Sequence, residues 1–411
     1  MRSSSPDITS DIKAVVDRHE TPDLTEPFVL SEASPHRPAL NDLSVELAAA
    51  SAGFRRSLPA GVVRALADLV RAMNCYYSNL IEGHDTHPVD IERAMRNDYS
   101  ADPHKRNLQL EAKAHVAVQG WIDGGGLSGR AMTVAALREI HKRFGELLPE
   151  QLLRVSEPDT HEIVLMVPGD LRHRDVRVGH HIPVSPGALP RFLARFEEVY
   201  GRLGRSETIL AAAAAHHRLL WIHPFLDGNG RVARLMSHAV LLEALDTGAV
   251  WSVARGLARR DTEYKAHLAA CDAPRRNDRD GRGTLSEEAL AAFTRFFLET
   301  CLDQVTFMEE LVQPERLRDR ILVWAEEDTR GDRLPAKAGQ VLEAVLFRGE
   351  LPRGDVAGLL GTGDRQARRV VSALLERGVL VSDSARAPLS ITFPAALASR
   401  WMPGLFPEKR D

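Results

Sequence analysis

The stretch WIHPFLDGNGRVARLM, residues 221–236, is the most informative part of the sequence. Its centre is a Gly228-Asn229-Gly230 turn that separates a proline-containing approach from the start of an apolar helix. Glycines at 228 and 230 allow backbone conformations closed to other residues, so successive N–H groups can point into one concavity and hold phosphate oxygens. The helix that begins near Arg231 adds the positive end of its dipole. The stretch therefore predicts an anion-binding loop between two helices.

Four side chains around this loop have the chemistry to handle a nucleotide. Arg231 and Arg234 are one helical turn apart, so their guanidinium groups can grip terminal phosphates together. Asp227 offers a carboxylate oxygen suited to Mg²⁺, which typically takes one carboxylate plus phosphate oxygens and waters. His223 can accept the proton of an attacking hydroxyl as a neutral imidazole. The alternative is a helix-capping turn with a solvated basic face, and the complete spacing favours the enzymatic interpretation.

Helical periodicity extends outward from this loop over most of residues 46–310, so the chain is predicted to be mainly α. Apolar residues recur there at three-to-four spacing in eight segments: Gly61–Leu80, Leu108–Asp123, Thr133–Leu148, Pro190–Leu203, Thr208–Ile222, Arg231–Asp246, Arg260–Ala270 and Ser286–Met308. One region differs. His161–Val167 and Asp175–Ile182 are β-branched and partly alternating, and they predict a β-hairpin joined by PGDLRHR.

The two ends of the chain differ from this helical domain. Residues 1–45 are rich in proline, serine and acids and are expected to form an N-terminal extension, as a tail or a wrap. Residues 311–335 are highly charged and are expected to be a linker. Residues 336–411 read as three helices followed by two short strands, which resembles a winged helix-turn-helix. Its third helix carries Arg365, Arg368, Arg369 and Arg377, which could contact DNA, with protein docking or dimer stabilisation as alternatives.

Composition sets limits on the kind of partner. With a net charge of −4, the protein as a whole has no positive electrostatic field that would attract nucleic acid or an anionic membrane. The longest apolar run is far shorter than the ~20 residues that span a bilayer. The polar, acidic N-terminus does not resemble a secretory signal, and the three cysteines are too few and too scattered for a disulfide framework. We therefore expect a cytoplasmic protein without a membrane segment.

The segment HPFLDGNGRVAR resembles the signature of the Fic family, H-x-F-x-[DE]-G-N-G-R-x-x-R, and fits it at every defined position. The resemblance implies a helical Fic fold and transfer of AMP from ATP, with Mg²⁺, to a serine, threonine or tyrosine hydroxyl of a protein. By this match, His223 is the base, Asp227 binds the metal, and Gly228, Asn229, Gly230, Arg231 and Arg234 bind the phosphates.

A second segment, SNLIEG at 78–83, is similar to the family's inhibitory motif [ST]-x-x-x-E-[GN]. The resemblance implies that Glu82 pairs with Arg234 and blocks the productive pose of the γ-phosphate, with Ser78 and Gly83 completing the motif. It also implies that the same glutamate can support removal of AMP. The alternative is an ordinary helix end with Gly83 as its C-cap.

Two weaker similarities concern the walls of the site. DVRVGHHIP resembles the family's flap, whose edge docks the target peptide by strand addition, with Val178 and Gly179 over the nucleotide. RRDTEYKAHLAACD resembles the segment lining the adenine pocket, where Tyr264 matches a family tyrosine and Lys265 replaces a second one. The family often forms dimers, so a homodimer is a further expectation.

A different class of function remains as the rival. The chain could be a nucleotide-sensing, DNA-binding transcriptional regulator without transferase activity. The intact His223 favours the transferase, because a sensor needs no base.

Overall fold

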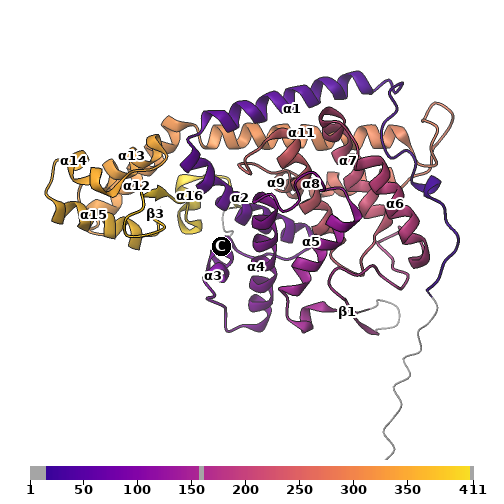
Figure 1. Ribbon diagram of the computed structural model, residues 1–411, viewed down its shortest axis with the longest axis horizontal. Helices are drawn as coiled ribbons and strands as arrows, with labels where there is room; N and C mark the ends of the chain where they lie inside the picture. Colours follow the sequence, from indigo (N-terminus) through magenta and orange to yellow (C-terminus); the bar gives the residue numbers. More distant parts are fainter. Residues whose placement is uncertain (1–14, 157–161, 408–411) are drawn as a thin grey trace, which may run out of the picture.

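The computed structural model describes residues 15–156 and 162–407. Within these residues the chain is mainly helical, with two pairs of short antiparallel strands (Figure 1). The helices are α1 Arg37–Ser57, α2 Ala60–Ile81, α3 Pro88–Met95, α4 Pro103–Asp123, α5 Val134–Glu146, α6 Leu189–Tyr200, α7 Arg205–Ile222, α8 Asn229–Leu245, α9 Ala254–Arg259, α10 Asp261–Cys271, α11 Glu287–Leu311, α12 Pro314–Arg330, α13 Ala338–Arg348, α14 Val356–Leu360, α15 Asp364–Glu376 and α16 Ala398–Trp401. The strands are β1 Arg154–Ser156, β2 Ile163–Leu165, β3 Leu380–Val381 and β4 Ser390–Ile391.

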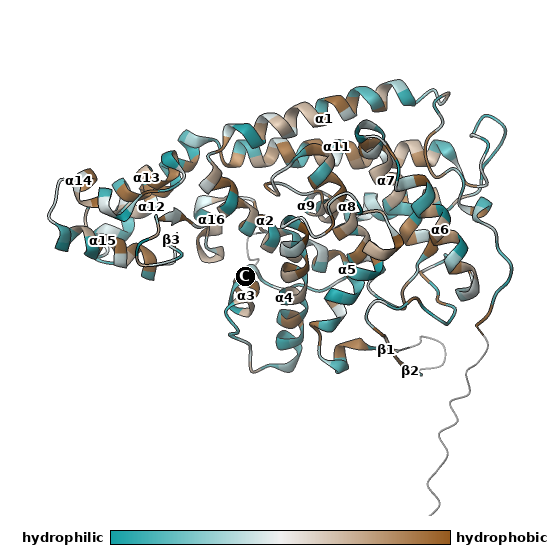
Figure 2. Cartoon of the chain, in the orientation of Figure 1, coloured by the Kyte–Doolittle hydropathy of each residue, from teal (hydrophilic) through white to brown (hydrophobic). Residues whose placement is uncertain are grey.

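Helices α7 and α8 form the centre of the fold. Both bury residues around most of their circumference, as expected for helices enclosed by others. Helix α7 contacts α6, α11 and α1, while α8 contacts α4 and α5. Helices α1 and α11 lie side by side along one edge of the molecule (Figure 1), and α1 carries mixed hydrophilic and hydrophobic residues typical of a surface helix (Figure 2). The loop between α7 and α8 is thus held by helices on several sides.

Local signals in the sequence explain where several helices begin. The side chain of Asp102 accepts a hydrogen bond from the N–H of His104 at 2.8 Å, and Pro103 occupies the first helical position of α4. Thr133 and Ser286 cap α5 and α11 in the same way. These caps satisfy N–H groups that the helix leaves unpaired.

All eight segments with helical periodicity are helical in the structure, with boundaries that shift by up to about five residues. Helices α1, α3, α9, α12 and α16 were not predicted. Helix α1 begins inside the expected N-terminal extension, and its most deeply buried apolar residues, Leu40, Leu47 and Phe54, are seven apart. Such a narrow stripe gives a weak periodic signal. Before α1, residues 15–30 run over the helical body, where Asp17 pairs with Arg191 of α6.

The predicted pairing of 161–167 with 175–182 is wrong. Strand β2 pairs instead with β1, with Arg154 opposite Leu165 and Ser156 opposite Ile163; His161 lies outside the described residues. Residues 175–182 form a separate tight turn, in which Val178 and His181 exchange backbone hydrogen bonds of 3.0 Å.

The run between the two predicted strands prevents them from pairing because it is fixed to the helical body. The N–H of Gly169 donates to Nδ1 of His141 on α5 at 2.8 Å. Three residues later, the N–H of Arg172 donates to the carbonyl of Pro224 at 2.9 Å. The chain is therefore carried along the body instead of turning back on β2.

The C-terminal part contains α13, α14 and α15 followed by the β3–β4 pair, in the expected order. The segment 311–335, expected to be a linker, contains α12. Its Trp324 is 1% exposed and packs edge-on against Trp401 at 5.1 Å between ring centroids. Helix α12 thus contributes to the core of this part. None of the helices described in the structure is long and apolar enough to cross a bilayer.

Candidate functional site

The loop between α7 and α8 is framed by two residues in left-handed backbone conformations. His223, directly after α7, has φ of +51°, which is uncommon for a residue with a side chain. Gly228, directly before α8, has φ of +78°, which glycine adopts without steric cost. The first-turn amides of Asn229, Gly230 and Arg231 donate to no group among the described residues. The structure therefore has free donors at the N-terminus of α8, as an anion site requires.

The side chain of Asn229 holds the loop in shape. It is 2% exposed, and its amide accepts from the N–H of Phe225 at 3.0 Å and donates to the carbonyl of the same residue at 2.9 Å. Both polar atoms are used within the loop. We therefore expect Asn229 to contact a nucleotide through its backbone amide and not through its side chain.

His223 is half-buried at the end of α7. Its Nδ1 lies 3.3 Å from the carbonyl of Leu220, so Nδ1–H is the donor and Nε2 carries the lone pair. Burial, followed by the positive charge of Arg172, lowers the pKa of His223 to about 4. The imidazole is therefore neutral at pH 7 and able to accept a proton.

Asp227 is exposed beside the start of α8. Its carbonyl lies 3.2 Å from Nε2 of His141, and the His141 ring stacks on Phe225 with 4.0 Å between centroids. No group of three or more potential metal ligands is present among residues 15–156 and 162–407. The single free carboxylate suits Mg²⁺, which takes its other ligands from phosphates and water. His141, which braces this loop, was not singled out in the sequence because a lone histidine on a helix carries no motif.

Arg231 is engaged by two residues that sequence reasoning missed. One of its terminal nitrogens lies 3.0 Å from Oε2 of Glu111 on α4 and 3.4 Å from Nδ1 of His84. Glu111 and His84 in turn contact each other at 2.9 Å. Arg231 is 8% exposed, and its Nε has no partner among the described residues. The first signature arginine is thus buried beside a carboxylate.

Arg234 is engaged by the SNLIEG segment. Its Nε donates to Oγ of Ser78 at 2.8 Å, and its terminal nitrogen pairs with Glu82, the residue directly after α2. Burial raises the pKa of Glu82, but the guanidinium of Arg234 outweighs it and holds this pKa below its usual range. A Cβ placed on Gly230 would lie 2.4 Å from Oε1 of Glu82. The carboxylate therefore lies directly over the loop, at the place where the phosphates are expected.

The remaining expected site residues lie around this centre. Gly83 follows Glu82 with φ of +84°. Val178 is 42% exposed, and Gly179 has φ of +59° at the tip of the tight turn, whose His181 reaches the carbonyl of Trp221 at 2.8 Å. Tyr264 is only 2% exposed, and its hydroxyl is 2.7 Å from Nε2 of His216. In this structure the Tyr264 ring lies in the core and presents no open face to an adenine base.

A cavity of about 70 Å³ lies beside the loop, lined by side chains that include His84, Glu111, His141, Asp227 and Arg231. Ligand pockets usually have at least ~300 Å³. This side of the loop is therefore closed to a whole nucleotide in the conformation described.

The fold and the site define a class of protein: a mainly helical molecule in which a helix N-terminus with free amides lies beside a neutral histidine. Residues 122–241 match the Fic/DOC family. This matched part is similar to the family; it contains the loop between α7 and α8 and lies within residues 46–310, which the sequence predicts to be one unit.

Two curated relatives carry the name "Protein adenylyltransferase Fic". The one from Culex quinquefasciatus is 30% identical over 199 residues, which is 46% of this chain and 35% of the relative. The one from Drosophila erecta is 41% identical over 78 residues, 18% of this chain and 16% of the relative. The chain thus spans about a third or less of the length of these relatives.

A solved structure, Fic-1 (aa134 - 508) from C. elegans, resembles this fold with a TM-score of 0.50 and 16% identity. The similarity covers 68% of this chain and 76% of that one. It supports a Fic-type helical fold.

Proposed function

We propose that this chain transfers AMP from ATP to a serine, threonine or tyrosine hydroxyl of a target protein or of itself. The proposal rests on the arrangement of charged and hydrogen-bonding groups around Gly230. There, the carboxylate of Glu82 pairs with Arg234 and lies beside Gly230, in the first turn of a helix whose leading amides are free, which is the position where a phosphate would bind. The Fic/DOC match and the relatives named as adenylyltransferases support the same reaction.

In this reaction His223 accepts the proton of the target hydroxyl. The hydroxyl oxygen then forms a bond to the α-phosphorus of ATP, and the bond to pyrophosphate breaks. The free amides of α8 and the two arginines would stabilise the negative charge of the phosphates, so catalysis consists chiefly of positioning and charge stabilisation. Asp227 would hold Mg²⁺, which supplies positive charge to the phosphates when bound. The tight turn at Val178 and Gly179 would receive the target peptide.

Glu82 would restrain this activity. A carboxylate on an arginine competes with a phosphate for the same donors, and Oε1 of Glu82 lies where a phosphate oxygen would approach Gly230. Removal of AMP by the same site is part of the proposal, because Glu82 lies close enough to the loop to orient a water molecule.

Incubation with ATP labelled at the α-phosphate tests the proposal. Glu82→Gly should raise label incorporation above the parent chain, and adding His223→Ala should abolish it. Glu146→Gly provides a matched control, since Glu146 is an exposed glutamate at the end of α5, away from the loop. No incorporation by Glu82→Gly with any target-containing extract would contradict the transferase assignment.

A specific feature of α15 supports DNA contact as a second candidate. Arg365, Arg368 and Arg369 are exposed on α15, and no ion pair joins them to the described residues. Such a face fits phosphates. Salt-dependent retention of duplex DNA, lost when all three arginines become alanine, would support it. Nucleotide binding without label transfer, together with DNA retention, would favour a regulator. A dimer, which the family resemblance implies, is tested by the mass of the purified chain in solution.

A further inference from the structure

Arg172 is a buried arginine whose hydrogen-bond acceptors are all backbone carbonyls. It is 3% exposed. Its Nε donates to the carbonyl of His223 at 2.7 Å, and one terminal nitrogen donates to the carbonyl of Arg174 at 2.9 Å. The other terminal nitrogen donates to the carbonyl of Val184. No carboxylate contacts this guanidinium among the described residues.

Such a placement is costly for a structural role alone. Removing a charged group from water is costly unless it is compensated, and burial lowers the pKa of Arg172 only to about 10, so the side chain stays charged at neutral pH. A neutral side chain could fill the same space at lower cost. The planar guanidinium of an arginine, however, can hold several separate carbonyls in fixed directions.

The carbonyls come from the two walls of the proposed site. His223 belongs to the loop that carries the base. Arg174 and Val184 stand at the two ends of the segment 175–183, which contains the tight turn assigned to the target peptide. The backbone N–H of Arg172 also donates to the carbonyl of Pro224 at 2.9 Å. One residue thus fixes the base-carrying loop and both ends of the peptide-docking segment.

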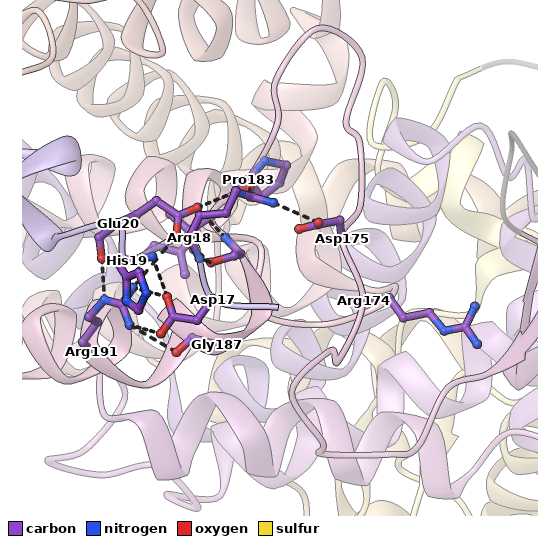
Figure 3. Close-up of polar contacts among 12 residues, drawn as sticks. Asp17, Arg18, His19, Glu20, Arg174, Asp175, Pro183, Gly187 and Arg191 are labelled. Carbon is purple, nitrogen blue, oxygen red and sulfur yellow. Dashed lines mark hydrogen bonds and ion pairs between the residues drawn. The ribbon is translucent and has the colours of Figure 1, made fainter. Parts of the chain in front are cut away.

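Residues 17–20 also contact this segment and its flank (Figure 3). Arg18 pairs with Asp175 at 2.9 Å and donates to the carbonyl of Pro183 at 3.2 Å. Glu20 accepts from the N–H of Ser185 at 2.9 Å. Asp17 and Glu20 anchor this strap to Arg191 of α6, whereas the side chain of Arg174 points away from the cluster in Figure 3.

We infer that Arg172 is a positioning residue that sets the docked target hydroxyl against His223, with residues 17–20 acting as a strap that keeps segment 175–183 seated on it. This inference rests on the proposed function. It concerns the transfer step and not nucleotide binding, because Arg172 contacts neither the first turn of α8 nor its arginines, which are paired with Glu111 and Glu82. The conservative replacement by lysine keeps the charge but loses the planar fork.

The test uses the full chain carrying Glu82→Gly, in which Arg172→Met and Arg172→Lys are compared with Arg154→Met, an exposed arginine of β1. We expect Arg172→Met to lower kcat by roughly a hundredfold, the scale of a 1 Å misplacement. The Kd of a non-hydrolysable ATP analogue should stay within about twofold of the parent, since α8 is unchanged. Arg172→Lys should recover part of kcat, and the control should match the parent. Equal losses in analogue binding and kcat, or an unchanged kcat, would overturn the inference.

A second variant keeps the inference testable if Arg172→Met does not fold. Arg18→Ala with Glu20→Gln removes strap contacts near the surface. It should accelerate hydrogen exchange at the amides of Val178 and His181 and lower kcat without changing the Kd of the analogue. Unchanged exchange or unchanged kcat would contradict the strap. If the Glu82→Gly parent itself transfers no AMP, the proposed function fails, while the exchange measurement still reports on the strap.

Discussion

At the scale of single residues, each arginine of the signature is matched by a glutamate from a different helix. Arg234 meets Glu82 at the end of α2, and Arg231 meets Glu111 within α4. The sequence allowed the first pair to be expected, because Glu82 lies in a short motif. It gave no sign of the second, since Glu111 is one acidic residue of a long helix and its partner is 120 positions away.

The pairing of Glu111 with Arg231 leads to a prediction for ATP affinity. In the Glu82→Gly chain, Glu111→Gln should lower the Kd for ATP by roughly three- to tenfold, because one charge-assisted bond to a carboxylate no longer competes with phosphate for Arg231. Glutamine keeps the size of the side chain and its ability to accept from Arg231. Isothermal titration with ATP and magnesium measures the effect.

Glu139→Gln is the matched control, because Glu139 also pairs with arginines, Arg130 and Arg143, but on the exposed side of α5. It should leave the Kd unchanged. A weaker affinity in Glu111→Gln would instead mean that Glu111 holds Arg231 in its phosphate-binding orientation.

At the scale of elements, the sequence was most informative where burial follows a regular period. The helices around the loop bury broad faces, so their apolar residues recur at three-to-four spacing and were recognised. Of the two strands predicted from local composition, only the first contains a strand, β2, which pairs with β1, while 175–182 forms a tight turn. The run between them is held by contacts with α5 and with the loop between α7 and α8. No local pattern records such contacts.

Helix α12 was not recognised as a helix, because its many charged residues obscure the pattern of its buried face. Most of its residues are charged, yet Leu317, Ile321, Trp324 and Ala325 are buried along one side. Trp324 also lies under the guanidinium of Arg377, 5.9 Å from the ring centroid. A helix can therefore be essential to a core while its composition resembles that of a linker.

The packing of α12 predicts a large loss of stability on truncation of Trp324. Trp324→Ala should lower the free energy of unfolding of the C-terminal part by about 3–5 kcal/mol, since it leaves a cavity against Trp401. Its neighbour Val323, which is 55% exposed, gives the control: Val323→Ala should change stability by less than about 0.5 kcal/mol. Thermal unfolding followed by tryptophan fluorescence and circular dichroism distinguishes the two. Similar unfolding of both variants would show that α12 is an independent connector.

At the scale of the whole molecule, the helical body buries several histidines as neutral groups. Burial is the main cause in each case, and it lowers the pKa to about 3 for His115 and His216 and to about 4 for His141, His217 and His223. In the unfolded chain these groups would titrate near pH 6.5. The unfolded chain therefore binds more protons than the folded one between about pH 6.5 and pH 4.

Because the unfolded state binds the extra protons, the free energy of unfolding must fall as the pH falls through this window. Above about pH 7 these histidines are neutral in both states and contribute no slope. Inside the window each histidine adds up to about 1.4 kcal/mol per pH unit to the slope of the free energy of unfolding. The melting temperature should therefore drop steeply below pH 6.5.

Two histidine variants test this cause. His216→Gln should make the drop in melting temperature less steep, whereas His104→Gln, which changes an exposed residue in the first turn of α4, should leave it unchanged. A melting temperature that stays constant from pH 7 to pH 5 would mean that the buried imidazoles gain protons without unfolding the helices around α7. In that case His223 could not be kept neutral by burial.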